Sequence, residues 1–163
     1  MLDIHWVPVG SGRLALTHRP KIRDIHLLPA LGCQRVVTLL YEKEGGPSIG
    51  RAVENAGMAW TWLPVPNGQY PEGETHALLL AALPVLAERL AAGESILIHC
   101  AAGIHRTGML AYALLRWHGY TGEQALERIG LMRSHTQLGL QDRQIAWGED
   151  VVKAIKGDTG FTS

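Results

Sequence analysis

The chain has 163 residues, the size of one typical domain and enough to bury a substantial core. Its 15 Lys and Arg residues balance 15 Asp and Glu residues, so the composition gives no sign of a nucleic-acid or membrane-surface binder. A hydrophobic content of 47% excludes a disordered chain, and two cysteines exclude a disulfide framework and indicate a reducing compartment. No secretory signal pattern opens the chain, so we expect a cytoplasmic protein forming one catalytic domain over 1–163.

Short apolar or β-branched runs alternate with helical runs along the chain. The strands are predicted over 3–9, 14–17, 35–40, 58–63 and 95–99. The helices are predicted over 20–31, 48–56, 75–92, 107–118, 121–133 and 141–156. Thr75 is the expected N-cap of its helix, Pro84 should kink or split that helix, and Thr121 with Gln124 forms a capping-box pattern.

This alternation predicts an α/β fold in a single domain. Strand–helix–strand units place parallel strands in one sheet, and their helices then cover its faces. The apolar run Ile96-Leu97-Ile98 is typical of a central strand buried on both faces. We therefore expect a central, mostly parallel sheet of about four to five strands flanked by helices.

The segment after that run carries the chemistry. The sequence reads His99-Cys100-Ala101-Ala102-Gly103-Ile104-His105-Arg106-Thr107-Gly108, so a buried strand is followed by a small-residue loop and a helix. Inward N–H groups of such a loop and the positive end of the helix dipole form an anion site. Cys100 at its mouth is favoured as a thiolate, and Arg106 can bind two phosphate oxygens at once. The pattern predicts in-line attack of sulfur on phosphorus and formation of a thiophosphate, without a metal or cofactor.

This segment resembles the protein-tyrosine phosphatase signature, His-Cys-x5-Arg-[Ser/Thr]-Gly, and Gly103 matches a further glycine of that motif. The rest of the chain is similar to the compact dual-specificity phosphatases, the group of the cyclin-dependent kinase-associated phosphatase. The matching stretches follow one another in the expected order over 12–20, 36–44, 63–71 and 143–147. The resemblance therefore covers nearly the whole chain and implies a protein-tyrosine phosphatase-like fold.

The resemblance also implies a role for each residue of the motif. Cys100 would be the nucleophile, Arg106 would bind phosphate, and the Thr107 hydroxyl would stabilise the departing thiolate. His99 would orient the loop and tune the thiol from behind. The phosphate oxygens would be held by the backbone N–H groups of Ala101, Ala102, Gly103, Ile104, His105 and Arg106.

The sequence departs from the family pattern at the general acid. Family members place an Asp in the loop after the strand over 58–63, whereas this chain has Asn67. A carboxamide does not donate a proton at neutral pH, and general acid catalysis contributes about 10²- to 10⁴-fold. Glu72, Glu74 or His105 would be the substitute donor, and His105 is attractive because an imidazole titrates near neutral pH.

Three further interpretations of Asn67 stay open. The substrate would need no acid if its leaving group were good, as in the RNA 5′-triphosphatase branch of the same superfamily. The chain would otherwise be a phospho-ligand-binding module with weak activity, or Asn67 would be an engineered change that traps substrate. We expect a slower enzyme than usual acting on a phosphorylated protein or small phosphomonoester, with no nucleic-acid or membrane partner.

Several residues outside the motif have two interpretations. Glu42 and Glu44 lie where some family members place an acidic residue near the site, or they form a solvated pair with Lys43. Cys33 is expected in the core, with a redox partnership to Cys100 as the less favoured alternative. Other candidates lie on a late segment that resembles a conserved family loop near the pocket, where a glutamine would position the hydrolytic water: Arg133, Gln137 and Gln141.

Overall fold

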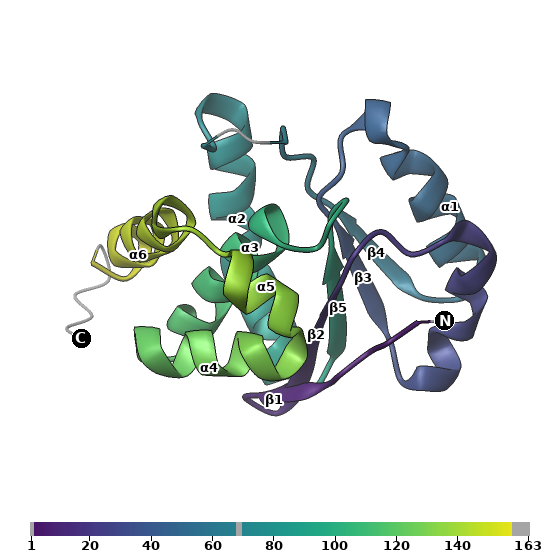
Figure 1. The fold of residues 1–163 in the computed structure, drawn as a ribbon, viewed down its shortest axis with the longest axis horizontal. Coiled ribbons are helices and arrows are strands. Elements are labelled where there is room, and N and C mark those ends of the chain that lie inside the picture. The colour runs from purple at the N-terminus through teal and green to yellow at the C-terminus, as the bar shows by residue number, and fades with distance from the viewer. Residues whose placement is uncertain (1, 68–69, 158–163) are drawn as a thin grey trace.

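The computed structural model describes residues 2–67 and 70–157 and is built around one five-stranded sheet (Figure 1). The strands lie in the order β1-β2-β5-β3-β4, and only the β1–β2 pair is antiparallel. Their bounds are β1 Val7–Val9, β2 Gly12–Thr17, β3 Arg35–Thr38, β4 Ala59–Trp62 and β5 Ser95–His99. The predicted α/β class and mostly parallel sheet are confirmed, and β5 is the central strand.

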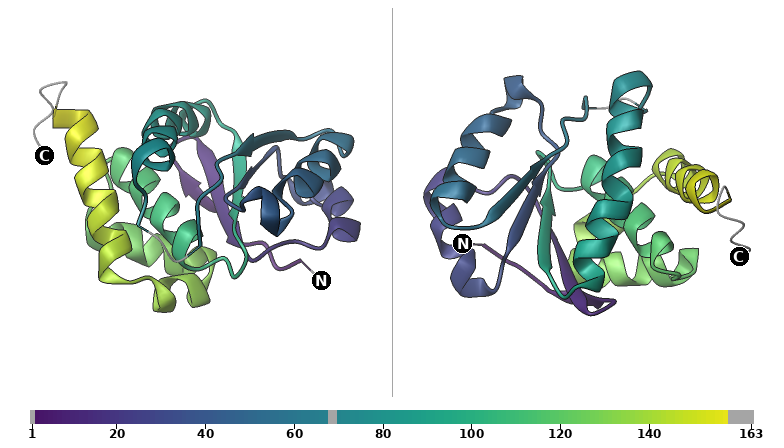
Figure 2. Two further views of the ribbon diagram at one scale, coloured as in Figure 1. Left: turned by 90° about the horizontal axis from the view of Figure 1, so that it is seen from above. Right: turned by 180° about the vertical axis from the view of Figure 1, so that it is seen from behind.

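Helices cover both faces of the sheet (Figure 2). One face carries α1 (Gly46–Asn55) and the 3-10 helices η1 (Ile22–Leu27) and η2 (Pro29–Leu31). The other face carries the remaining α-helices, namely α2 (Gly73–Ala91), α3 (His105–Trp117), α4 (Gly122–Met132), α5 (Ser134–Gly139) and α6 (Asp142–Gly157). A further 3-10 helix, η3 (Glu42–Glu44), follows β3.

The side chains of β5 show how the sheet divides the core. Ile96 and Ile98 point into the apolar cluster under α2, α3, α4 and α6, whereas Leu97 points into the cluster under α1 and η1. All five residues of β5 are buried, as a strand covered on both faces requires. Alternation with a period of two residues thus joins the two halves of the core through one strand.

The structure corrects several expected boundaries. The helix predicted over 20–31 is instead η1 and η2, because Pro29 lacks the amide hydrogen that a continuous α-helix needs there. Helix α2 begins at Gly73 with Glu72 as its N-cap, so Thr75 is not the cap, and Pro84 does not split the helix. The short helix α5 was not predicted.

Other local signals are confirmed. Thr121 Oγ1 accepts from the backbone N of Gln124 at 3.2 Å, and the Gln124 side chain accepts from the Thr121 backbone N at 2.9 Å, which completes the capping box. Across the described residues, no helix combines the length and apolar character that a membrane crossing requires.

Parallel pairing brings four loops together at the carboxyl end of the sheet. The carboxyl ends of β2, β5, β3 and β4 lie side by side, with Thr17 and Thr38 both in register with His99. The loops after these strands therefore meet around the end of β5, at the upper edge of the sheet in Figure 1. The candidate site forms at this carboxyl end of the sheet.

Candidate active site

The small-residue loop joins β5 to α3 as predicted. Residues 101–104 form consecutive bends, and α3 begins at His105. Cys100 is only 3% exposed, and the Thr107 hydroxyl donates to its Sγ at 3.1 Å. The motif therefore places a hydroxyl donor from the first turn of α3 against the thiol.

The loop carbonyls are bonded on the outer side of the loop. His99 Nδ1 lies 3.1 Å from the Cys100 oxygen, and the Thr136 hydroxyl donates to the Gly103 oxygen. Two further donors are the Arg19 backbone N on Ala101 O at 2.9 Å and Arg133 Nη1 on Gly103 O at 3.1 Å. In a trans peptide the C=O and the next N–H point in opposite directions. The N–H groups of Ala101, Ala102 and Ile104 therefore point away from these partners, toward the inner side of the loop, as an anion cradle requires.

Gly103 is the residue that lets the loop pass close to β2. Its φ of 71° lies in the left-handed region, which glycine adopts without strain. A Cβ at this position would collide with the Thr17 carbonyl oxygen and lie 2.7 Å from the His18 backbone N. The glycine matched to the motif is thus required by both backbone conformation and space.

Arg106 is almost fully buried and is held by Glu44. Its Nη1 donates to Glu44 Oε1 at 2.7 Å and its Nη2 to Oε2 at 2.9 Å, while Nη1 also reaches the Val65 carbonyl at 2.9 Å. Burial lowers the pKa of Arg106, but the bond to Glu44 and the charges of Cys100 and Glu44 raise it above its ordinary value. The same hydrogen bond holds the pKa of Glu44 below its usual range. Glu44 is therefore an anion and not a proton donor.

The structure distinguishes between the two glutamates after β3. Glu44 closes η3, where the Tyr41 backbone N donates to its Oε1 at 3.0 Å. Glu42, by contrast, is exposed. The interpretation of Glu44 as an acidic residue near the site is confirmed, whereas a solvated pair with Lys43 does not describe it.

His99 lies under the loop and is fully buried. Burial lowers its pKa to about 4, so the imidazole is neutral at physiological pH. Its Nε2 lies 2.8 Å from Thr38 Oγ1, which also accepts from Trp60 Nε1 at 2.8 Å. The ring is thus anchored to β3 directly, and to β4 through Thr38, as well as to the loop.

Among the described residues of the loop after β4, the bonds to the rest of the protein lie at its start. The Val65 backbone N donates to the Leu39 carbonyl at 3.1 Å, and Val65 O accepts from Arg106. Asn67 is exposed two residues later, and 68–69 lie outside the described residues. The remaining acid candidates, Glu72, Glu74 and His105, are exposed as well, the last at the first position of α3.

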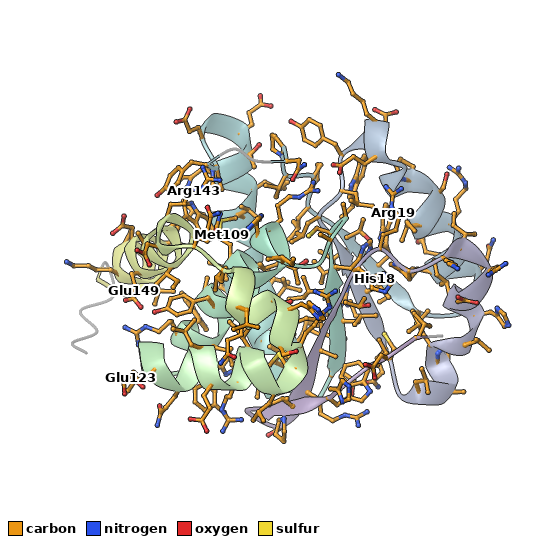
Figure 3. All side chains as sticks on the ribbon, in the orientation of Figure 1. His18, Arg19, Met109, Glu123, Arg143 and Glu149 are labelled. Carbon is orange, nitrogen blue, oxygen red and sulfur yellow. The ribbon has the colours of Figure 1, made fainter. Side chains whose placement is uncertain are left out.

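Two arginines outside the motif also approach the loop. Arg19 follows β2, and its guanidinium lies 3.8 Å from the position that a Cβ on Gly45 would occupy, beside the η3 segment (Figure 3). Burial lowers the pKa of Arg133, and negative charge at Cys100 opposes that shift. The loop itself lacks lysine, and the sequence analysis named His105 as the only extra cation. It missed Arg19, because the position of this residue depends on the parallel pairing of β2 with β5.

The late segment supports the loop differently from what was expected. Gln137 Nε2 donates to the Leu126 carbonyl at 3.0 Å, so this side chain ties α5 to α4 and does not reach the pocket. Gln141 contributes a backbone N–H to Gln144 Oε1 at 2.8 Å. A different glutamine of α6, Gln144, borders a small hollow with Met109 and with Tyr70 of the loop after β4.

Cys33 is excluded as an intramolecular redox partner of Cys100. It precedes β3, whose first residue pairs with Ile96, whereas Cys100 follows the opposite end of β5. The four residues of strand from Ile96 to Cys100 span roughly 13 Å. Cys33 lies two residues before the partner of Ile96, so it is beyond the Cα separation of about 7 Å that a disulfide allows. Burial raises the pKa of the Cys33 thiol to about 12, so it is unreactive. Among the described residues, no group of three or more His, Cys, Asp or Glu is placed to hold a metal ion.

Similar proteins include phosphatases. The family model described as "Swiss Army Knife protein, DSP-PTPase phosphatase domain" matches residues 4–148. A search of curated protein sequences finds no match. The structure is similar to kinase-associated phosphatase carrying a Cys-to-Ser substitution at its catalytic site, with a TM-score of 0.73 and 18% identity over 98% of this chain and 97% of that chain.

Two other solved structures are similar. Tk-PTP in its active form has a TM-score of 0.68 and 26% identity over 90% of this chain and 92% of that one. PTPMT1 in complex with PI(5)P has a TM-score of 0.74 and 20% identity over 94% and 98% of the two chains. With the signature loop between a buried strand and a helix, these matches show that the chain belongs to the dual-specificity type of the protein-tyrosine phosphatase superfamily and is a cysteine-dependent phosphatase.

Proposed function

We propose that the protein hydrolyses phosphomonoesters in two steps through a thiophosphate on Cys100. The observation that carries this proposal is the 3.1 Å bond from the Thr107 hydroxyl to Cys100 Sγ at the base of a loop whose carbonyls are bonded outward. A thiolate there faces the inward N–H groups that would hold three phosphate oxygens. Its substrate is a phosphorylated protein or small phosphomonoester, and its thiol chemistry suits the cytoplasm.

In the first step Cys100 Sγ attacks phosphorus and the leaving oxygen departs on the opposite side. The bonds from Arg106 to Glu44 use Nη1 and one hydrogen of Nη2. The edge formed by Nε and the second Nη2 hydrogen is then available to bind two phosphoryl oxygens in parallel. Glu44 would thus orient the arginine without competing for that edge.

In the second step water attacks the thiophosphate and Cys100 leaves as a thiolate. The Thr107 hydroxyl donates to sulfur in the structure, so the same bond stabilises the negative charge that returns there. Gln144 is buried beside Met109, and it replaces Gln137 and Gln141 as the candidate to position the water.

The proton for the leaving group would come from His105. Asn67 supplies no proton, and Glu44 is held as an anion by Arg106. His105 is exposed on the rim of the loop, adjacent in sequence to the phosphate-binding arginine. Glu72 and Glu74 are the competing donors, at the start of α2.

The test measures kcat/KM from pH 5 to 9 for the wild type, Cys100→Ser, Asn67→Asp and His105→Ala. Each protein is assayed with p-nitrophenyl phosphate, whose leaving group is good, and phenyl phosphate, whose leaving group is poor. We expect Cys100→Ser to be inactive and His105→Ala to lose about 10²-fold on phenyl phosphate and much less on p-nitrophenyl phosphate. Equal losses on both substrates would contradict His105 as the acid, and an active Cys100→Ser would contradict the mechanism.

A phospho-ligand-binding module with weak activity is the second candidate, and Asn67 is the observation that favours it. Under that function Asn67→Asp would raise turnover of phenyl phosphate by about 10²-fold, whereas His105→Ala would change little. Because an Asn followed by Gly is prone to deamidation, the mass of the peptide carrying Asn67 is measured in every preparation. A fraction of Asp in that peptide would otherwise be mistaken for intrinsic activity.

A further inference from the structure

A chain of hydrogen bonds runs from the outer strand β4 to the loop between β5 and α3. Trp60 on β4 donates from Nε1 to Thr38 Oγ1 on β3 at 2.8 Å. Thr38 Oγ1 lies 2.8 Å from Nε2 of His99 on β5. Nδ1 of the same ring lies 3.1 Å from the Cys100 carbonyl oxygen. Three adjacent strands thus each contribute one side chain to a continuous path.

The direction of every bond in this chain follows from its chemistry. A carbonyl oxygen only accepts, so His99 Nδ1 carries a hydrogen. The imidazole is neutral because burial, and to a lesser extent the nearby Arg19, Arg106 and His18, oppose its protonation. Nε2 therefore has a lone pair and accepts from the Thr38 hydroxyl. Thr38 has then used its one hydrogen, and its oxygen accepts from the indole N–H, which only donates.

We propose that Trp60 and Thr38 are positioning residues that hold the His99 ring with its Nδ1–H directed at the Cys100 carbonyl and thereby fix the peptide plane between Cys100 and Ala101. The carbonyl selects the Nδ1–H tautomer, because the bond that one ring nitrogen makes sets the state of the other. The Thr38 hydroxyl donates to the lone pair left on Nε2, and Trp60 orients that hydroxyl, so both nitrogens of the ring are held. The role assigned to Cys100 here rests on the proposed function, but the orientation of the ring does not.

The consequence for the reaction lies in one N–H group. Because the peptide is planar and trans, a Cys100 carbonyl held by His99 turns the Ala101 N–H toward the inner side of the loop. That N–H is one of the donors available to the thiolate and to the phosphoryl oxygens. If the ring turned away, the Cys100 carbonyl would lose this donor. The Ala101 N–H would then no longer be held toward the inner side of the loop.

The chain offers a matched control for the indole. Trp62 stacks on Trp60 with ring centroids 5.7 Å apart, and its Nε1 donates to the Leu40 carbonyl at 2.7 Å, outside the chain of bonds. Trp60→Phe and Trp62→Phe each remove one indole N–H and keep an aromatic ring on the same strand. A purely structural contribution of the tryptophans affects both variants, whereas of these two indoles it is that of Trp60 that bonds to Thr38.

The experiment compares wild type, Thr38→Val, Thr38→Ser, Trp60→Phe and Trp62→Phe. Imidazole 15N chemical shifts report the tautomer of His99, whose signals are the ones missing from His99→Gln. If that variant does not fold, the signals are identified as those of the imidazole that stays neutral down to about pH 5, since the pKa of His99 is about 4. The pH dependence of Cys100 alkylation by iodoacetamide and of kcat/KM for p-nitrophenyl phosphate is measured on the same proteins.

We expect the Nδ1–H tautomer in every variant, with an Nε2 that accepts a hydrogen bond in wild type, Thr38→Ser and Trp62→Phe. In Thr38→Val the 15N shift of Nε2 should move to that of a nitrogen without a donor, alkylation should move to higher pH, and kcat/KM at pH 6 should fall by about tenfold. Trp60→Phe should shift the same readouts less, because Thr38 can still donate. Unchanged alkylation and kcat/KM in Thr38→Val, or equal shifts in Trp60→Phe and Trp62→Phe, would overturn the proposal. A changed Nε2 shift in a protein that never forms a thiophosphate would instead contradict the proposed function alone.

Discussion

The phosphate loop and the loop after β4 meet at the same edge of the sheet but are held to very different degrees. The phosphate loop is bonded from β2, β5 and α5 through the carbonyls of Cys100, Ala101 and Gly103. The loop after β4 is bonded at Val65, and Asn67 is already exposed. Among the described residues, the loop that keeps the family motif therefore makes more bonds than the loop that departs from the family at Asn67. Under the proposed function, phosphate binding would depend on preorganisation, whereas proton donation would depend on one exposed side chain.

The largest expected effect tests whether the proposed phosphate site depends on the geometry of Arg106 or only on its charge. Arg106→Lys should lower kcat/KM for p-nitrophenyl phosphate by about 10²- to 10³-fold, because an ammonium lacks the two-pronged edge. Steady-state kinetics measure the change, and Arg51→Lys on the exposed face of α1 is the control. Activity within threefold of wild type would show that charge alone suffices.

The next effect concerns stability. The pKa of His99 falls from 6.5 to about 4 on folding, so between these values the unfolded chain binds a proton that the folded chain does not. The free energy of unfolding should therefore decrease as the pH falls from 6.5 to 4, by about 3 kcal/mol from this residue. Urea unfolding at pH 7.5, 6 and 5 measures the slope.

His99→Gln should show a flatter pH dependence of unfolding, whereas His135→Ala, on an exposed position of α5, should keep the wild-type slope. The Glu44 carboxylate adds to the same trend, because its pKa is lowered by Arg106 and its contribution is lost on acidification. Equal slopes in His99→Gln and wild type would refute the buried neutral imidazole.

A smaller effect is expected at the residue that orients the arginine. Glu44→Gln should lower kcat/KM by about tenfold, because an amide does not offer two acceptors to the guanidinium. Glu42→Gln, two residues earlier and exposed, is the matched control and should match wild type. If the two variants behaved alike, Glu44 would have no part in positioning Arg106.

The last prediction compares the reactivity of the two thiols toward an alkylating reagent. Iodoacetamide at pH 7 should label Cys100 and leave Cys33 unlabelled, because burial raises the pKa of Cys33 to about 12. Mass spectrometry of the native protein then shows one adduct, and Cys100→Ser shows none. A Cys33 adduct formed at a similar rate would contradict its assignment to the core.

The sequence predicted the features that depend on contiguous residues. The central strand, the loop from Cys100 to Arg106 and the capping box at Thr121 all follow from patterns within about ten residues, and the structure confirms their positions. The class of fold followed from the alternation of these elements. Local patterns suffice where neighbouring residues determine the conformation.

Specific side-chain contacts between distant segments were not predicted. The resemblance placed Glu44 near the site, but not its paired bonds to Arg106, 62 residues away, nor the partners of His99 on β3 and β4. Gln137 was assigned to the pocket from its place in a motif-like segment, yet its direction is set by contact with α4. Side-chain direction is decided by tertiary packing, which sequence spacing alone does not specify.

The outward bonding of the loop has a consequence for the course of the reaction. A cradle that is already formed binds an oxyanion whether or not it is attached to a substrate, because no ordering cost distinguishes the two. Inorganic phosphate, released in the second step, should therefore act as a competitive inhibitor. The enzyme would slow as its own product accumulates, and its rate in the cell would follow the local phosphate concentration.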